Sequence, residues 1–152
     1  SIFALNLSDR ILENTEYKFV IAQHPYSSEY DLNRYKNIIL LPEGCDFYPI
    51  FTQSDLMITD YSSLFYDCLY DDKPIIFYAP DYKKYTKTRE FFVEYEDIPG
   101  PIIGDSEELI ENIKLFLEDK TNIKPRNYDL WKNKVYSYID GDNCKRVAEK
   151  LP

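Results

Sequence analysis

Short apolar runs alternate along this chain with longer segments whose apolar residues recur at helical spacing. Four of these runs are bounded by turn residues or proline, at 18–23, 38–41, 55–59 and 74–78, and a shorter one lies at 101–103. Continuous apolar runs of this length are typical of parallel strands that are buried on both faces. The pattern therefore predicts a series of short parallel strands, each closed by a turn.

The segments between and after these strands have the periodicity of helices. Within 62–69, for example, Leu64, Phe65, Cys68 and Leu69 fall on one helical face. Further helices are predicted at 3–12, 47–53, 81–89 and 106–117, whereas 27–36 is interpreted as a loop with a helical turn.

The helices near the end of the chain have clear terminal signals. Asp105 precedes the periodic segment 106–117 and Glu108 follows three residues later, which is the spacing of a capping box. Two more helices are predicted to close the chain. The first carries Trp131, Val135, Tyr138 and Ile139, and the second carries Val147, Ala148 and Leu151 with Asp142 or Asn143 as its cap.

Strands that alternate with helices predict an α/β fold, a Rossmann-like parallel sheet with helices on both faces. A length of 152 residues suits a single domain, residues 1–152. Ligands of such sheets sit beyond the carboxyl ends of the strands. This rule selects His24 after the first strand, 60–63 after the third and 79–81 after the fourth.

The clearest candidate chemistry is the sequence Asp60-Tyr61-Ser62-Ser63, which joins the third strand to a predicted helix. Free N–H groups in the first turn of a helix, together with two hydroxyl groups, can hold a phosphate without net positive charge. The structural alternative is that Ser62 or Ser63 merely caps the helix. Spacing alone leaves both interpretations open.

Two further side chains suit an anionic ligand. His24 is the only histidine and follows a strand at the ligand edge, where it could donate hydrogen bonds or act as a general acid or base. Arg89 ends the dense basic run 83–89, which is either a solvated helix face or a phosphate clamp. A structural role for His24 stays equally open.

Composition narrows the function classes. A formal net charge of -9 argues against general affinity for nucleic acid or for a membrane surface, so a phosphate would need a local site. No apolar stretch reaches the ~18 residues of a membrane helix. Cys45, Cys68 and Cys144 are odd in number and widely spaced, which indicates reduced thiols in a cytoplasmic protein.

The sequence says less about cofactors, about the role of its tyrosines and about the ends of the protein. No cluster of His, Cys or carboxylates has ligand spacing, so we expect no resident metal and leave open a divalent cation that arrives with a nucleotide. The 15 tyrosines are spread along the chain, which favours packing at the core edge over ligand stacking. The chain begins at Ser1 with no strand before the first predicted helix, so we expect it to belong to a longer protein.

The segments SDLMITDYSSLFYDCLYDDKPIIFYAPD, at 54–81, and EYEDIPGPIIGDSEELIENI, at 94–113, resemble one family closely. They are similar to the C-terminal region of the CDP-glycerol glycerophosphotransferases, the polymerases and primases of teichoic acid and related capsule enzymes. The likeness runs from about 19 to about 117, and DGDNCKRVAEKL, at 140–151, resembles the closing segment of the family.

The resemblance implies the C-terminal half of a GT-B-type transferase built from two Rossmann-like halves. CDP-glycerol or a related CDP-alcohol would bind mainly in this half, and glycerol phosphate would pass to an acceptor hydroxyl with release of CMP. The implied partners are the N-terminal half of the same enzyme and a lipid-linked polymer acceptor. The full-length enzyme would be peripheral at the inner face of the cell membrane.

The resemblance also assigns the site. His24 matches the histidine of the family's His-Pro pair near the pyrophosphate, Ser62 and Ser63 match its phosphate-holding serines, and Asp67 matches the aspartate of the following helix. Asp60 adjoins these substrate-binding residues. Arg89 matches the arginine of an Arg-Gly pair, but Glu90 stands where the family has glycine.

The second catalytic histidine of the family, the implied base for the acceptor hydroxyl, belongs to the N-terminal half. This chain has no second histidine. We therefore expect the chain alone to bind donor without turning it over.

The sequence bears on four alternative functions. A response-regulator receiver is rejected because its lysine ends a strand far downstream of the phosphorylated aspartate. Here Lys73-Pro74 begins a strand only one short helix after Asp60. A glycosyltransferase of the same architecture that uses a nucleotide sugar, a CDP-ribitol-dependent transferase and a non-catalytic binding module all stay open, since fold does not determine function.

Overall fold

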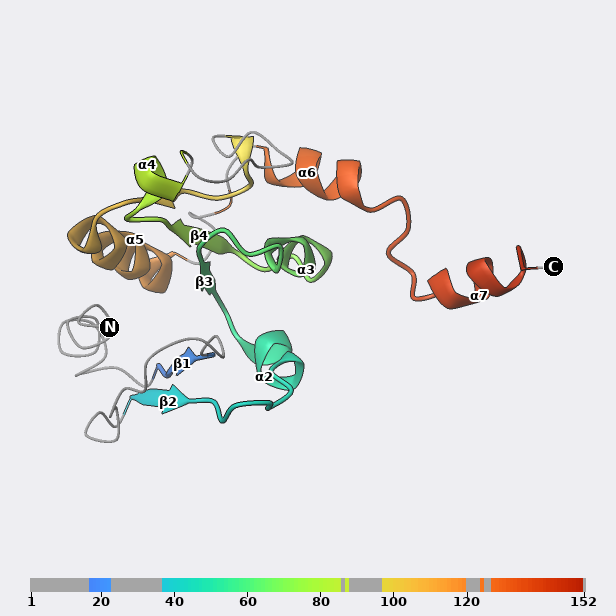
Figure 1. The fold of residues 1–152 in the computed structure, drawn as a ribbon, viewed down its shortest axis with the longest axis horizontal. Coiled ribbons are helices and arrows are strands. Elements are labelled where there is room, and N and C mark those ends of the chain that lie inside the picture. The colour runs from blue at the N-terminus through green and yellow to red at the C-terminus, as the bar shows by residue number, and fades with distance from the viewer. Residues whose placement is uncertain are drawn as a thin grey trace.

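The computed structural model describes residues 17–22, 37–85, 87, 97–119, 124 and 127–151. The helix predicted at 3–12 and the loop predicted at 27–36 lie outside these described residues. Figure 1 shows the described chain as strands flanked by helices, with the C-terminal segment extending away from them.

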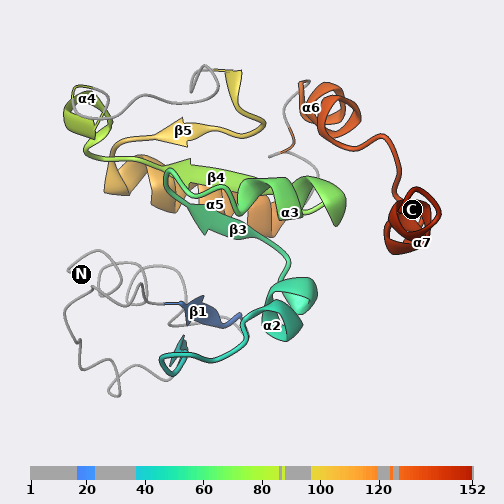
Figure 2. The ribbon, with the colours of Figure 1, turned by 45° about the vertical axis from the view of Figure 1, so that its right-hand side comes forward.

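The strands form two parallel sheets, as Figure 2 shows. The smaller sheet pairs β1 with β2, and the larger has the order β3-β4-β5. The bounds are β1 (Phe19–Ile21), β2 (Ile38–Leu40), β3 (Met57–Thr59), β4 (Ile75–Tyr78) and β5 (Ile102–Ile103). All five predicted strands are therefore present, and their parallel pairing is confirmed.

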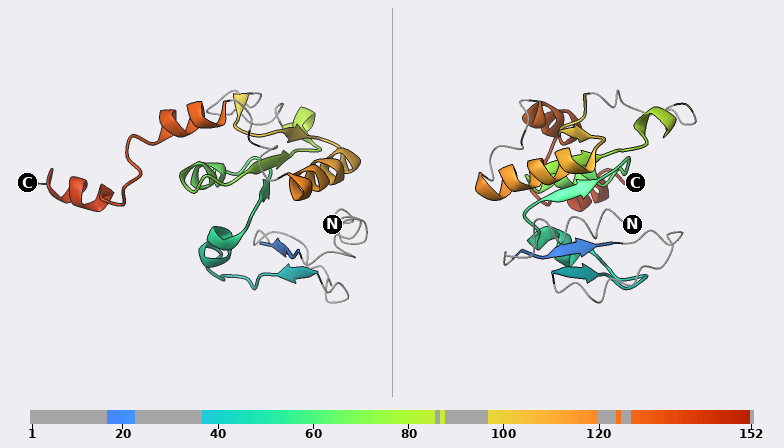
Figure 3. Two further views of the ribbon diagram at one scale, coloured as in Figure 1. Left: turned by 180° about the vertical axis from the view of Figure 1, so that it is seen from behind. Right: turned by 90° about the vertical axis from the view of Figure 1, so that its left-hand side faces the viewer.

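The sequence pattern predicts one continuous sheet, and this prediction is wrong for the part of the chain that the structure describes. Phe19 of β1 and Ile58 of β3 both pack against the hydrophobic cluster that includes Ile76, so side-chain contacts join the two sheets there. The strands are two to four residues long, which leaves little backbone to extend a ladder. In Figure 3 the small sheet lies beside β3.

Helices occur near their predicted positions. Their bounds are α2 (Tyr48–Gln53), α3 (Phe65–Tyr70), α4 (Tyr82–Tyr85), α5 (Ser106–Glu118), α6 (Tyr128–Val135) and α7 (Asn143–Ala148). The predicted helix at 62–69 begins later, at Phe65. Among the described residues, none of these helices is long and apolar enough to cross a membrane.

The core lies on both faces of β4. Ile75 and Phe77 point to a cluster that α3 and α6 complete, whereas Ile76 points to the cluster beneath α5. All three side chains are almost fully buried, as expected for a central parallel strand. The predicted arrangement of helices on both faces is therefore confirmed for the larger sheet.

Capping fixes the start of α5. The Asp105 carboxylate accepts hydrogen bonds from the backbone N–H groups of Glu107, at 2.8 Å, and Glu108, at 3.2 Å. These two N–H groups have no partner within the helix, so Asp105 satisfies them in the way that the predicted capping box requires. The buried face of α5 then carries Leu109, Ile110, Ile113 and Phe116.

Buried polar contacts hold α6 and the turn before β4 in place. The Tyr128 hydroxyl lies 2.9 Å from the Cys68 carbonyl oxygen and 2.7 Å from that of Lys73. The Lys73 ammonium donates to the Ser54 carbonyl oxygen and lies 5.1 Å above the Phe51 ring. Lys73 is thus a structural residue, which agrees with the rejection of a receiver.

The C-terminal arm, residues 137–151, differs from its prediction. Because α6 ends at Val135, Tyr138 and Ile139 lie beyond it and are exposed, and Val147 of α7 is exposed as well. Asp142 occupies the cap position of α7 without a side-chain capping bond.

The side-chain contacts within the C-terminal arm form a small polar cluster. The Arg146 guanidinium binds Asp140 at 2.7 and 2.9 Å and lies 3.9 Å from the centre of the Tyr138 ring. The hydrogen bonds from Arg146 lower the pKa of Asp140 to about 2. Apart from the contact of the Tyr138 ring with Arg146, the large apolar side chains of the arm are exposed.

The Pro99-Gly100-Pro101 turn generates the first testable prediction. A Cβ atom at Gly100 would lie 2.6 Å from the Ile75 carbonyl oxygen and 2.9 Å from the Phe77 ring. Since the first of these is backbone, we expect Gly100→Ala to lower the free energy of unfolding by about 1–3 kcal/mol, measured by urea denaturation.

Gly104→Ala is the matched control, because the nearest atom to its Cβ is 3.9 Å away. This variant should change the free energy of unfolding by less than about 0.5 kcal/mol. Equal stability of the two variants would contradict the proposed steric role of Gly100.

Candidate functional site

The carboxyl ends of β3 and β4 lie side by side. Thr59, the last residue of β3, pairs in register with Phe77, and β4 ends one residue later at Tyr78. The two predicted ligand loops therefore leave the same edge of the larger sheet (Figure 2). We call residues 60–63 the hydroxyl turn.

The hydroxyl turn precedes α3 rather than opening it. The cap position of α3 is Leu64, which makes no side-chain capping bond. The Ser62 Oγ accepts a hydrogen bond from the Leu64 N–H at 3.3 Å, and the Ser63 carbonyl oxygen accepts one from the Tyr66 N–H at 3.0 Å. The bond to Ser62 is of the kind that a capping side chain makes, so the structural and the ligand-binding interpretations of this serine both stay open.

Both serine side chains are exposed to solvent. The bond that Ser62 accepts uses a lone pair and leaves the hydroxyl proton available for donation. Asp60, at the start of the turn, is also exposed. The turn thus presents two hydroxyl donors at the edge where the fold places ligands.

Asp67 contacts another element of the fold. Its carboxylate accepts a hydrogen bond from the Tyr48 hydroxyl of α2 at 3.0 Å. This hydrogen bond and the charge of Asp67 raise the pKa of Tyr48. The hydrogen bond between Tyr48 and Asp67 therefore links α2 to α3.

Three residues connect the ligand loops, and Tyr85 is the one that lies outside the segments 60–63 and 79–81 selected from the sequence. The Tyr61 hydroxyl donates to the Asp81 carboxylate at 2.8 Å. The Tyr61 ring also stacks on the Tyr85 ring, with 3.7 Å between centroids and 12° between planes. An available signal was the presence of tyrosines in the loop after β3 and in the helix that follows the loop after β4.

Cations lie on α4, directly after Asp81. Lys83 and Lys84 are exposed on this helix, and Lys87 is exposed just beyond it. The predicted site residues His24 and Arg89 lie outside the described residues. Their roles stay predictions, as do the ligand contacts of Asp60, Ser62, Ser63 and Asp67.

The site is electrostatically mixed. The carboxylates of Asp60 and Asp81 disfavour an anion, whereas the ammonium groups of α4 and the serine hydroxyls favour it. Within the described part of the chain, no three His, Cys, Asp or Glu side chains gather as a metal site would require. Cys45, Cys68 and Cys144 are free thiols.

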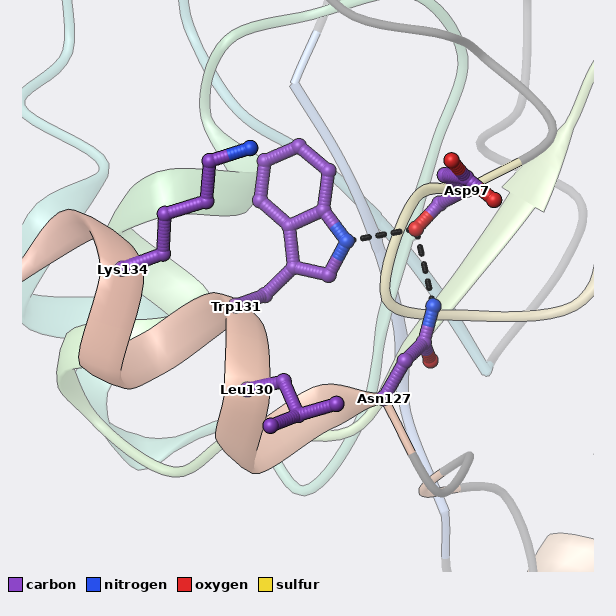
Figure 4. A pocket seen from close by; sticks show the side chains of 5 residues that line it. All are labelled: Asp97, Asn127, Leu130, Trp131 and Lys134. Carbon is purple, nitrogen blue, oxygen red and sulfur yellow. Dashed lines mark hydrogen bonds between the residues drawn. The ribbon is translucent and has the colours of Figure 1, made fainter.

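A pocket of about 240 Å³ lies elsewhere, and Figure 4 shows its lining residues. The Trp131 indole and the Asn127 amide both donate to the Asp97 carbonyl oxygen, the latter at 2.8 Å. These donors are therefore engaged within the protein. The pocket adjoins the turn before β5, at the amino ends of the strands, and contains none of the predicted site residues.

Comparison with known proteins gives a consistent family. The sequence profile of the CDP-glycerol:poly(glycerophosphate) glycerophosphotransferases matches residues 6–151. Among curated relatives, a teichoic acid poly(glycerol phosphate) polymerase of Bacillus spizizenii is 33% identical over 90% of this chain and 35% of its own length. A teichoic acid ribitol-phosphate primase of the same organism is 29% identical over 91% of this chain and 35% of its own.

Solved structures agree. A variant of the wall teichoic acid polymerase TagF has a TM-score of 0.80 and 27% identity, covering 96% of this chain and 36% of that one. A TagF variant soaked with CDPG has a TM-score of 0.75 and 26% identity over 95% and 36%. The chain thus spans about a third of the length of these relatives.

The Tyr48–Asp67 contact leads to a testable prediction. Asp67→Asn should lower the pKa of Tyr48 toward its ordinary value, because the charge that opposes phenolate formation is lost. An NMR pH titration of ring-labelled tyrosines, with Tyr48→Phe for assignment, measures this. Asp129→Asn on α6 is the control and should leave the Tyr48 titration unchanged.

The sign of the linked stability follows from the raised pKa. Tyr48 binds its proton more tightly in the folded state, so the contact stabilises the fold below the ordinary tyrosine pKa. This stabilisation is lost as pH rises through the raised value. An unshifted Tyr48 titration in Asp67→Asn would contradict the contact.

Proposed function

The chain belongs to the CDP-glycerol:poly(glycerophosphate) glycerophosphotransferase family, and from this membership we propose that it is the donor-binding part of a transferase. The enzyme moves glycerol phosphate from CDP-glycerol to an acceptor hydroxyl and releases CMP. The product is a teichoic-acid or capsule polymer.

The hydroxyl turn is the observation that carries this proposal. It places Ser62 and Ser63, both exposed, beyond the carboxyl end of β3, where sheets of this class bind ligands. Ser62 retains a proton to donate while its lone pair is held by the Leu64 N–H. The two hydroxyls bind the pyrophosphate of the donor as hydrogen-bond donors, which suits a chain of net charge -9.

The chemistry is displacement at phosphorus. The acceptor oxygen attacks the phosphorus that bears glycerol, the bond from this phosphorus to the bridging oxygen breaks, and CMP leaves with that oxygen. His24 stabilises or protonates the departing phosphate, and Arg89 neutralises its charge. Asp60 and Asp67 complete the substrate-binding set. A divalent cation that arrives with the nucleotide is compatible with this scheme.

The chain acts as one domain, residues 1–152, of a longer GT-B-type enzyme. The remaining polypeptide supplies the base for the acceptor hydroxyl and binds the lipid-linked polymer. Relatives about three times as long as the region they share with this chain support this division. The full-length enzyme is peripheral at the inner face of the cell membrane.

CDP-ribitol is the second candidate donor. The ribitol-phosphate primase and the glycerol-phosphate polymerase resemble this chain to similar degrees, 29% and 33%. Both alcohols are carried on the same CDP group, so the proposed pyrophosphate contacts are identical for the two donors.

Calorimetric titration with CDP-glycerol tests the donor site. We expect the chain to bind CDP-glycerol in preference to UDP-glucose, and CDP-ribitol serves as the third ligand. Ser62→Ala/Ser63→Ala should weaken binding by roughly tenfold or more, because two hydrogen bonds to a charged phosphate are lost. Ser137→Ala, on the exposed C-terminal arm, is the matched control and should bind like the original chain.

The outcomes separate the candidates. Tighter binding of CDP-ribitol would change the donor, and preference for UDP-glucose would favour a glycosyltransferase. Binding that survives loss of both hydroxyls would move the pyrophosphate away from the hydroxyl turn. Absence of nucleotide binding would favour a non-catalytic module.

A turnover assay tests the proposed division of labour. We expect the chain alone to release no CMP from CDP-glycerol above background, because the base for the acceptor lies in the remaining polypeptide. A full-length member of the family serves as the positive control. Acceptor-dependent CMP release by the 152-residue chain would overturn this part of the proposal.

A further inference from the structure

The side chain of Tyr61 spans the two ligand loops. Its hydroxyl donates to Asp81 at 2.8 Å, and its ring stacks on Tyr85 at 3.7 Å. These contacts join the loop after β3 to the loop and helix after β4. We call this group of three residues the tyrosine clamp.

Helix α4 depends on contacts outside itself. It has four residues and buries none of them fully. A helix of that length is unstable in isolation, because nucleation costs more than its few hydrogen bonds return. Its backbone bonds, from the N–H groups of Lys84 and Tyr85 to the Asp81 carbonyl oxygen, form at the residue whose side chain Tyr61 holds.

The clamp lies between two kinds of group that can bind a phosphate, the serine hydroxyls and the lysine ammonium groups. Ser62 follows Tyr61 directly, and Lys83 and Lys84 lie between the two residues that Tyr61 contacts. Fixing Tyr61 against α4 therefore fixes the backbone of the hydroxyl turn relative to the backbone from which the lysine side chains extend. The serine hydroxyls donate hydrogen bonds without charge, and the lysine ammonium groups add positive charge.

We propose that Tyr61 is a positioning residue, which orients the hydroxyl turn and α4 toward one diphosphate group. This inference rests on the proposed function for the identity of the ligand. The clamp itself is a property of the protein alone. It acts through Ser62 and the lysines of α4 and does not touch the reacting atoms.

Asp81 acts in the clamp as a hydrogen-bond acceptor. A carboxylate beside a diphosphate repels it, so charge at this position brings no benefit to an anion site. An amide oxygen accepts the same bond from the Tyr61 hydroxyl. Asp81→Asn should therefore preserve the clamp, whereas a residue that worked through its charge would fail on this change.

The variants divide the clamp into its parts. Tyr61→Phe removes the hydrogen bond and keeps the ring, and Tyr61→Leu removes both. Asp81→Asn keeps the acceptor. Tyr138→Leu, on the C-terminal arm, is the matched control for the loss of a partly exposed tyrosine ring.

Amide hydrogen exchange is the first measurement, and it needs no ligand. We expect Tyr61→Leu to accelerate exchange at the N–H groups of Leu64, Lys84 and Tyr85 by about tenfold or more. Tyr61→Phe should give a smaller acceleration, and Asp81→Asn and Tyr138→Leu should leave these rates unchanged. Unchanged rates at all three amides in a folded Tyr61→Leu chain would overturn the clamp.

Titration with CDP-glycerol is the second measurement. Tyr61→Phe should weaken binding about two- to tenfold, the effect of one lost hydrogen bond. Asp81→Asn should bind at least as tightly as the original chain, because a charge that repels the diphosphate is removed. Weakening by Asp81→Asn as large as that by Tyr61→Leu would overturn the acceptor role. Accelerated exchange in Tyr61→Leu without nucleotide binding by the original chain would support the clamp and contradict the proposed function.

Discussion

The burial of β4 on both faces is the constraint on which the rest of this structure depends. Its alternate residues belong to different clusters, Ile75 and Phe77 with α3 and α6, and Ile76 with α5. Because both clusters use one strand of four residues, the helices of the two faces are fixed relative to each other. The same strand carries the ligand edge, since Asp81 follows it by three residues.

Tyrosine has a consistent role around this core. Tyr128 and Tyr136 donate to backbone carbonyl oxygens of the α3 region, and Tyr48 and Tyr61 donate to the carboxylates of Asp67 and Asp81. The ring contributes apolar contact while the hydroxyl satisfies a polar group. In a chain rich in acidic residues, this gives carboxylates near the candidate site a partner that brings no positive charge.

Sequence periodicity located the strands because each is an uninterrupted apolar run, and it located α5 because Asp105 and four buried residues agree in phase. It failed at the end of α6, where Tyr138 and Ile139 continue the apolar pattern but lie beyond the last helical residue. Apolar spacing cannot show whether a surface is available to cover those side chains.

For the site, the rule that ligands bind beyond the carboxyl ends of the strands correctly brought the loops after β3 and β4 to one edge. It could not predict the hydrogen bond from Tyr61 to Asp81. This bond depends on the register of the two strands, in which Thr59 pairs with Phe77, and the local sequence pattern does not reveal that register.

The Pro-Gly-Pro turn and the hydroxyl turn lie at opposite ends of the strands and carry separate information. Gly100 is needed because backbone passes close to it at the amino end of β4, so this motif reports on folding. Ser62 and Ser63 are exposed, and under the proposed function their presence reports on ligand chemistry. If the serines hold the donor as proposed, a homologous sequence that kept the first motif and lost the second would fold normally and lack the donor site.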